Sequence, residues 1–190
     1  MSKVKRSLAE AERIAAEIVV DLSTYCDRIS VAGSVRRRKC EVGDLELVAI
    51  PARGAGGLFS DIATNLLWEH LHASDRYHFT KGDNPNGRYY QLALSLYPDL
   101  QADLFLAETD NWGLILLVRT GSAEFSTAAL ARWKRRQGIG PEQAGSVGGR
   151  LVRRDGEVVP TPEEETVFES LGLPWIAPEQ RHCGPSWERV

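Results

Sequence analysis

Two carboxylates separated by one residue, Asp44 and Glu46, are the strongest chemical signal in the sequence. They open the apolar segment 44–50, whose alternation predicts a strand, so both side chains point to one face about 6.5–7 Å apart. Neighbouring carboxylates repel each other, and a divalent cation offsets that repulsion. The pair therefore indicates a metal site, with a solvated edge strand of alternating charge as the alternative.

A phosphate-binding turn is expected just before the carboxylate pair. Gly33 and Ser34 follow the apolar run 29–32, which predicts another strand. A glycine lets backbone N–H groups approach an anion, and the start of a helix presents such groups to phosphate. Positive charge follows from Arg36, Arg37 and Arg38. A phosphate turn beside a carboxylate pair indicates metal-assisted nucleotide chemistry.

The order of these residues resembles the signature of the DNA polymerase beta-like nucleotidyltransferases, and in particular that of the family X DNA polymerases. That signature is Gly-Ser followed by Asp-x-Asp, and this chain has Glu46 at the last acidic position. The change keeps a carboxylate for metal binding and adds one methylene. The third carboxylate of the family is matched in kind by Asp103, whereas Gln101 stands where many members have an arginine.

A second resemblance lies in the C-terminal half, where 120–126 is similar to the family X segment Thr-Gly-Ser-x-x-Phe that begins a nucleotide-binding subdomain. Val118 and Arg119 replace the aromatic pair that contacts the sugar in relatives, which puts sugar discrimination in question. Ala123 and Ser126 occupy the positions of side chains near the base. The run 171–174, Leu-Gly-Leu-Pro, and the later Arg181 are similar to the family's C-terminus and have a structural role.

The resemblance implies a role for each matching residue. Asp44, Glu46 and Asp103 would be the catalytic residues and the ligands of two Mg²⁺ ions, with Mn²⁺ as a substitute. The implied nucleotide-binding residues are Gly33, Ser34, Arg37, Gly43, Thr120, Gly121, Ser122, Ala123 and Ser126. The cations expected to bind DNA are Arg132, Lys134, Arg135 and Arg136.

The expected fold class is α+β, a nucleotidyltransferase palm with a mixed β-sheet and helices on one face, followed by a small α/β C-terminal lobe. The palm would span 1–108 and the thumb-type, nucleotide-binding domain 109–190. The predicted helices are 7–22, 58–72, 111–118, 122–137 and one that Thr161 caps and Pro162 begins. Ser7 is the expected cap of the first, and Ser122 and Gly138 are the expected ends of 122–137. The predicted strands are 27–32, 44–50, 76–80, 88–96, 101–106, 150–152 and 157–159, with a turn at Pro98–Asp99.

Composition limits the remaining choices. The chain has 190 residues, 43% of them hydrophobic, and a formal net charge of −3. A strong non-specific nucleic-acid binder is usually basic, although cations outnumber anions between 111 and 155. The three cysteines, Cys26, Cys40 and Cys183, have neither zinc spacing nor a disulfide pattern. With no signal peptide or membrane-spanning run in the sequence, we expect a cytoplasmic monomer without a membrane partner.

Three functions are compatible with these observations. The first is a minimal family X DNA polymerase of the gap-filling or repair type, which adds dNMP to a DNA 3′-hydroxyl and releases pyrophosphate; its partners are dNTP and primer–template or gapped DNA. The second is template-independent transfer to another acceptor, such as RNA, a small molecule or a protein. The acidic net charge and the absent base-reading side chains favour this alternative. The third is a non-catalytic nucleotide- or DNA-binding module.

Overall fold

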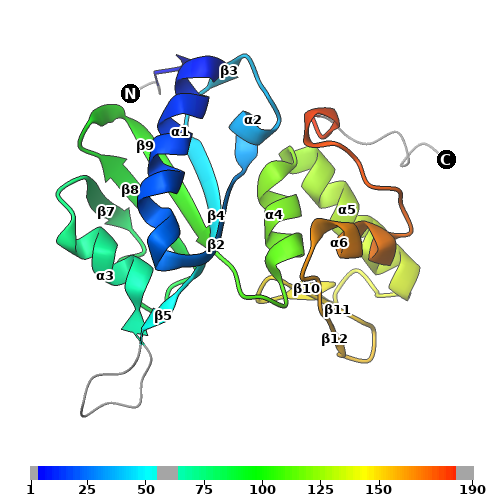
Figure 1. The fold of residues 1–190 in the computed structure, drawn as a ribbon. Helices are drawn as coiled ribbons and strands as arrows, with labels where there is room; N and C mark the ends of the chain where they lie inside the picture. The colour runs from blue at the N-terminus through cyan, green and yellow to red at the C-terminus, as the bar shows by residue number, and fades with distance from the viewer. Residues whose placement is uncertain (1–3, 55–63, 183–190) are drawn as a thin grey trace, which may run out of the picture. The chain divides into compact units, whose positions relative to one another are not determined.

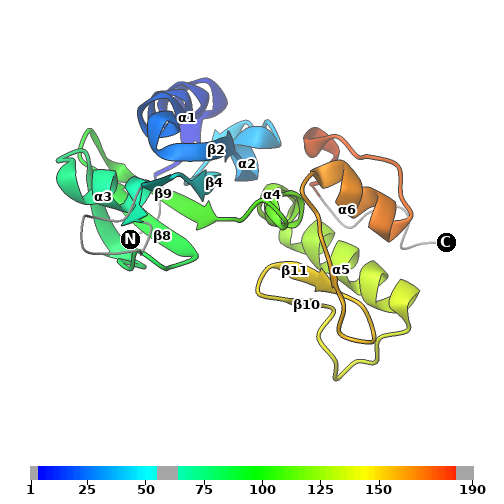
Figure 2. The ribbon, with the colours of Figure 1, turned by 60° about the horizontal axis from the view of Figure 1, so that its bottom comes forward.

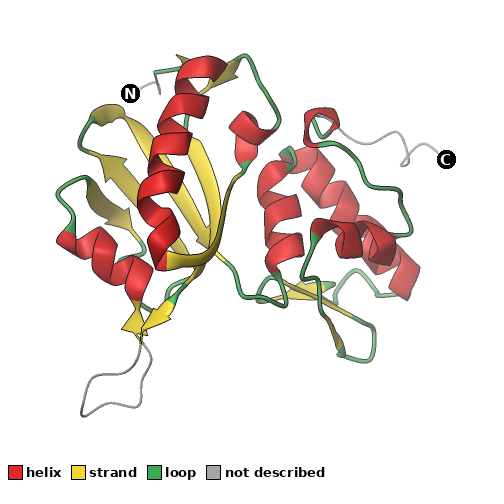
Figure 3. Ribbon diagram, viewed as in Figure 1, coloured by secondary structure: helices red, strands yellow, loops and turns green. Residues whose placement is uncertain are grey.

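The computed structural model describes residues 4–54 and 64–182, and the chain divides into two compact units, Met1–Ala107 and Glu108–Val190 (Figure 1). Both units contain helices and strands (Figure 3), so the predicted α+β class is confirmed. None of the helices in the described residues is long and apolar enough to cross a membrane.

The first unit is built on a five-stranded mixed sheet. Its strand order is β2-β4-β9-β8-β7, and only β4 and β9 run parallel to each other. The strands are β2 (Cys26–Val31), β4 (Leu45–Pro51), β7 (Tyr77–Lys81), β8 (Tyr89–Leu94) and β9 (Tyr97–Leu106). The parallel pairing of β4 with β9 brings together two segments that lie far apart in the sequence.

Two helices pack on one face of this sheet, as Figure 1 shows for α1 (Leu8–Leu22) and α3 (Leu66–Ala73). The Ser7 side chain accepts a hydrogen bond from the Glu10 N–H, which confirms the predicted cap of α1. Its buried stripe of Ala11, Ile14, Ala15, Ile18 and Leu22 packs with the inward side chains of the strands. Shorter elements complete the unit: β1 (Arg6–Ser7), η1 (Ser23–Tyr25), α2 (Gly33–Arg36), β3 (Glu41–Val42), β5 (Arg53–Gly54) and β6 (Thr64–Asn65).

Two predicted boundaries in this unit are wrong. The helix expected over 58–72 begins at Leu66, because Thr64–Asn65 pairs with Arg53–Gly54 as a strand and the Asn65 side chain caps the helix. The earlier part of that prediction, 58–63, lies outside the described residues. The turn expected at Pro98–Asp99 is instead made by Ser95–Leu96, since Leu94 pairs directly with Tyr97.

The second unit consists of three helices and a small antiparallel sheet. The helices are α4 (Trp112–Thr120), α5 (Ala123–Gln137) and α6 (Glu164–Leu171), with η2 (Pro178–Gln180) near the end of the described chain. The strands are β10 (Ser146–Val147), β11 (Arg150–Val152) and β12 (Val158–Val159). In the view of Figure 2, α6 and the strands β10 and β11 lie on either side of α5. Phe125, Trp133, Leu151 and Phe168 are buried together in the core of this unit.

The caps of the helices in this unit are predicted with mixed success. Ser122 accepts from the Phe125 N–H, and Gly138 ends α5 with φ 61°, as the sequence predicts. The prediction for α6 is wrong, because Glu163 rather than Thr161 is its N-cap. The backbone of Thr161 is bonded to the start of α4: its N–H donates to the Asp110 carbonyl and its carbonyl accepts from the Gly113 N–H.

Candidate active site

The strand register places two of the predicted carboxylates side by side. Glu46 of β4 is the direct partner of Asp103 of β9 in the parallel ladder. Their neighbours Leu45, Leu47 and Leu104 are buried in the core beneath α1 and α3. Because side chains alternate along a strand, Glu46 and Asp103 lie on the opposite face of the sheet, and both are partly exposed. Asp44, also partly exposed, lies just before β4.

The phosphate turn meets the carboxylate pair directly. Gly33 has φ 59°, and a Cβ on this residue would lie 2.0 Å from Oε2 of Glu46. The Ala32 N–H also donates to the Glu46 carbonyl at 2.8 Å. The missing side chain of Gly33 is therefore what allows the Glu46 carboxylate to lie against the turn, and the left-handed backbone there favours glycine.

Ser34 and the arginines continue this turn. The Ser34 Oγ is buried and has no hydrogen-bond partner within the described residues. It belongs to α2, a single helical turn of four residues, and in such a turn the first N–H groups have no acceptor inside the helix. Arg37 is 8% exposed, whereas Arg38 is exposed and has φ 57°. Gly43, partly exposed, lies between Val42 of β3 and Asp44.

Asp103 is held by donors from the neighbouring strand β8. The Tyr89 hydroxyl donates to its Oδ1 at 2.7 Å, and the Gln91 side-chain amide donates to the same oxygen at 3.1 Å. Gln91 is also the direct partner of Asp103 in the antiparallel ladder. These contacts set the orientation of a carboxylate that the sequence identifies as a metal ligand.

The donor set fits a hard divalent cation in kind and in register. Mg²⁺ prefers carboxylate oxygens, keeps several waters, and binds through one or two carboxylates plus substrate phosphates rather than in an all-protein cage. The adjacent Glu46 and Asp103 meet that requirement, and the turn at Gly33 lies beside them. Across residues 4–54 and 64–182, no three His, Cys, Asp or Glu side chains are grouped so that they could hold a metal ion, so the predicted trio of Asp44, Glu46 and Asp103 is not assembled as one such group.

The predicted nucleotide-binding residues of the second unit are largely engaged within that unit. Thr120 is fully buried, and Ser122 and Ser126 are less than 10% exposed. The Ser122 N–H donates to the Arg181 carbonyl, its hydroxyl accepts from the Phe125 N–H, and the Ser126 hydroxyl donates to the Val118 carbonyl. Gly121 is partly exposed and Ala123 is exposed.

The four predicted DNA-binding cations lie near the end of α5. Arg132 donates to the carbonyls of Leu171 and Gly172 at the end of α6, and Lys134 donates to the Pro141 carbonyl. Arg135 and Arg136 are exposed, and the guanidinium of Arg136 lies against Gly172. Two of the four, Arg132 and Lys134, thus make hydrogen bonds to backbone carbonyls within this unit.

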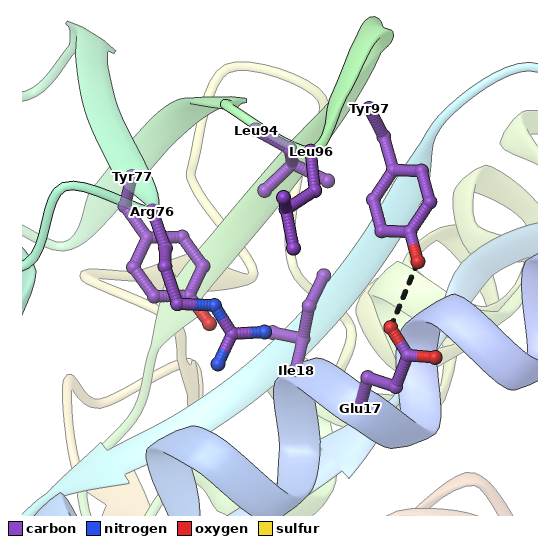
Figure 4. A pocket seen from close by; sticks show the side chains of 7 residues that line it. All are labelled: Glu17, Ile18, Arg76, Tyr77, Leu94, Leu96 and Tyr97. Carbon is purple, nitrogen blue, oxygen red and sulfur yellow. Dashed lines mark hydrogen bonds between the residues drawn. The ribbon is translucent and has the colours of Figure 1, made fainter.

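Figure 4 shows a small depression on the α1 side of the sheet, and its lining does not resemble the carboxylate site described above. It lies among Ile18 of α1, Leu94 and Leu96, with Glu17, Arg76, Tyr77 and Tyr97 around it. The Tyr97 hydroxyl donates to Glu17 at 2.9 Å, which lowers the pKa of that carboxyl. Apolar contacts and a satisfied polar pair make this a packing seam between helix and strands.

The Cys26 thiol is not suited to act as a nucleophile. Cys26, at the start of β2, is partly buried, and burial raises the pKa of its thiol to about 12. The thiolate is the reactive form of cysteine. Cys26 is therefore unsuited to nucleophilic chemistry near neutral pH. The other cysteine in the described chain, Cys40, is exposed.

The sequence interpretation missed Tyr89 and Gln91. Their signal is the spacing of two polar side chains by one residue on the strand that pairs with the Asp103 strand. A turn at Pro98–Asp99 would have paired Tyr97 with Leu100 and so placed Leu94 opposite Asp103. The observed turn at Ser95–Leu96, together with the register shift between Ala93 and Leu94, places Gln91 there instead.

Comparisons with known proteins agree with this arrangement. Residues 115–182 match a family model described as DNA polymerase beta thumb. The chain is 29% identical over 163 residues to DNA polymerase lambda of Rattus norvegicus, an alignment that covers 78% of this chain. It spans only 28% of that relative's length. Together, the thumb match of the second unit and the similarity to DNA polymerase lambda support a family X polymerase-like protein.

Proposed function

We propose that the chain is a metal-dependent nucleotidyltransferase that adds dNMP to the 3′-hydroxyl of DNA and releases pyrophosphate. The new bond joins the hydroxyl oxygen to the α-phosphorus, and the bond from that phosphorus to the bridging oxygen breaks. The similarity to DNA polymerase lambda supports the reaction class. Primer–template or gapped DNA, in a filling or repair role, is the proposed acceptor.

The residues of the first unit take the following roles in the proposal. Asp44, Glu46 and Asp103 hold the divalent ions, and Asp103 lies closest to the acceptor and takes the hydroxyl proton. Bound Mg²⁺ or Mn²⁺ supplies Lewis acidity, which favours the alkoxide and offsets charge on pyrophosphate. The turn of Gly33 and Ser34, with Arg37, binds the terminal phosphates.

One observation carries this proposal: the register that places Glu46 opposite Asp103, with Gly33 packed against the Glu46 carboxylate. Adjacent carboxylates repel each other, and a divalent cation offsets that repulsion. A divalent cation that binds together with a nucleoside triphosphate explains why these two carboxylates lie beside a turn suited to phosphate.

The remaining residues assigned to nucleotide or DNA binding, most of them in the second unit, are part of the same proposal. Gly43 of the first unit and the segment Thr120, Gly121, Ser122, Ala123 and Ser126 would support nucleotide binding. Arg132, Lys134, Arg135 and Arg136 would contact DNA phosphates. The two exposed cations, Arg135 and Arg136, are the more accessible to a phosphate backbone.

Incorporation of labelled dNMP into a one-nucleotide gapped duplex tests the proposal. We expect incorporation by the wild type and a loss of about 1,000-fold in Asp44→Ala, since metal-based stabilisation is worth several kcal/mol. Asp99→Ala is the matched control, because this exposed aspartate lies on β9 but far from the ligand row. Absence of incorporation by the wild type, or an unchanged rate in Asp44→Ala, would overturn the proposal.

Template-independent transfer is the second candidate, and the environment of Ser126 favours it. Ser126 occupies the position of a base-reading side chain in the resemblance, yet it is 8% exposed and its hydroxyl donates to the Val118 carbonyl. Extension of a DNA or RNA primer alone, compared with a primed template, separates the two candidates. Equal extension with and without template supports the second candidate, whereas template-dependent selection of the incoming base supports the first.

A further inference from the structure

Asp103 lies in a row of polar side chains that crosses the sheet. Its partner on β4 is Glu46 and its partner on β8 is Gln91, so these three side chains share one face. Beyond Gln91, the hydroxyl of Thr80 on β7 donates to the Gln91 side-chain oxygen at 3.1 Å. The row therefore runs from the edge strand β7 to the proposed metal ligands.

The hydrogen bonds along this row have one direction. With its oxygen bonded to Thr80, the Gln91 amide presents its NH₂ group to Asp103 Oδ1 at 3.1 Å and to the Tyr89 hydroxyl at 3.1 Å. The Tyr89 hydroxyl donates in turn to Oδ1 at 2.7 Å. The ring of Tyr89 is stacked on Phe105, with centroids 5.1 Å apart and planes at 30°, which limits its rotation.

We infer that Tyr89 and Gln91, with Thr80 behind them, are positioning residues that orient Asp103 for a divalent cation. Two donors converge on Oδ1, and within the described chain the structure gives Oδ2 no partner, so Oδ2 is the oxygen left for the metal. Partners that orient a ligating carboxylate tune metal affinity, typically by 10–100-fold. This inference rests on the proposed function only in taking Asp103 as a metal ligand.

The test measures metal binding without turnover. Mn²⁺ is titrated into the full chain, and free Mn²⁺ is followed by electron paramagnetic resonance. We expect Tyr89→Phe to weaken Mn²⁺ binding about 10-fold, Gln91→Met to weaken it similarly, and Thr80→Val to weaken it less. With dNTP and an acceptor present, kcat should fall in parallel while KM for dNTP stays unchanged.

Tyr90→Phe is the matched control. Tyr90 is adjacent on the same strand, but it belongs to the buried core on the other face, and its hydroxyl contacts Asn65 and the Asn84 carbonyl. Removing that hydroxyl perturbs the strand without touching Asp103. We expect unchanged Mn²⁺ affinity in Tyr90→Phe, with thermal unfolding of both tyrosine variants recorded to compare their folding.

A double-mutant cycle separates orientation from general damage. In an Asp103→Asn background, Tyr89→Phe should no longer change Mn²⁺ affinity. Equal effects of Tyr89→Phe and Tyr90→Phe, persistence of the effect without Asp103, or an Asp103→Asn variant with normal Mn²⁺ affinity would each overturn the inference. If the wild type transfers no nucleotide but Mn²⁺ affinity still depends on Tyr89 through Asp103, the proposed reaction fails and the positioning role stands.

Discussion

The two units use similar polar groups in opposite ways. In the first unit, the Ser34 hydroxyl is buried and lacks a hydrogen-bond partner in the described chain. In the second, the Ser122 hydroxyl caps α5 and the Ser126 hydroxyl bonds the Val118 carbonyl. Polar groups that are already satisfied stabilise the fold but have little left to offer a ligand. Of these three serine hydroxyls, that of Ser34 is the one left for a ligand under the proposed function.

Charged groups show the same contrast. Glu46 and Asp103 are like charges placed side by side. In the second unit, Arg181 is fully buried and donates to Glu164 at 2.7 Å, with the rings of Phe125, Phe168 and Trp175 around its guanidinium. In the proposed function a divalent cation from solution binds the first pair, whereas the buried Glu164 is bonded by Arg181 of the same unit. Variants that remove one group from each unit test this contrast.

The largest expected effect is on the stability of the second unit. Arg181→Met leaves the buried Glu164 without its partner, and we expect the free energy of unfolding to fall by about 3–5 kcal/mol. Arg153→Met is the control, because Arg153 pairs with Glu157 on the surface and such pairs contribute below about 1 kcal/mol. Urea unfolding measures both. Equal losses in the two variants would contradict the importance of the buried pair.

A smaller effect is expected for the glycine that contacts Glu46. Gly33 and Gly138 have φ 59° and 61°, but an added Cβ would meet Glu46 at 2.0 Å in the first and only Arg154 at 3.9 Å in the second. Gly138→Ala should therefore cost only the backbone strain, about 1 kcal/mol. Gly33→Ala should cost about 2 kcal/mol, since Glu46 must also move, and should impair nucleotide transfer. Equal effects of Gly33→Ala and Gly138→Ala on the free energy of unfolding and on nucleotide transfer would contradict this prediction.

The next comparison concerns the two serines. Ser122→Ala removes a helix cap and should lower the free energy of unfolding by about 1 kcal/mol, with little change in dNTP binding. Ser34→Ala should leave stability unchanged and raise KM for dNTP about 10-fold, the value of one hydrogen bond to a charged group. Chemical unfolding and steady-state kinetics on both variants decide the matter. If Ser122→Ala raised KM for dNTP and Ser34→Ala lowered the free energy of unfolding, dNTP binding would be assigned to the second unit instead of the first.

The smallest expected effect is pH-dependent. Arg150 donates to Asp110 and lowers the pKa of that carboxyl below its ordinary 3.8. The stabilisation is therefore fully present at neutral pH and is lost as the pH falls below 3.8. Because the pair is partly exposed, Asp110→Asn should cost below about 1 kcal/mol at neutral pH and nothing in strong acid. Unfolding measured at both pH values checks this, with Asp99→Asn, at an exposed position outside this pair, as the control.

Local signals in the sequence predicted much of the fold. The apolar stripe and Ser7 cap of α1 and the Ser122 and Gly138 ends of α5 are encoded within one or two turns of chain. The cap of α6 was missed because Thr161 is held by hydrogen bonds to the start of α4. A distant contact of that kind leaves no mark in the local pattern.

The residues of the candidate site were predicted only in part, because some of their contacts come from segments that are distant in the sequence. Residue type and spacing predicted Asp44 and Glu46 as metal ligands, the family resemblance implied Asp103, and the structure brings Asp103 beside Glu46. The donors to Asp103 depend on the register of the β8–β9 hairpin, which a turn at Pro98–Asp99 would have shifted. Whether a buried serine hydroxyl finds a hydrogen-bond partner depends on packing from several elements. The sequence therefore assigned both Ser34 and Ser122 to nucleotide binding, although only Ser122 was also predicted as a helix cap.

The buried Arg181 has a consequence for the order of events during synthesis. The carbonyl of this residue holds the Ser122 N–H, and its side chain neutralises Glu164. A growing chain can close the first unit once residue 107 is free, but the second must wait until Arg181 emerges. Until then, the second unit lacks the hydrogen bond that the Arg181 guanidinium makes to Glu164, and a chaperone has a longer time to bind this half than the first.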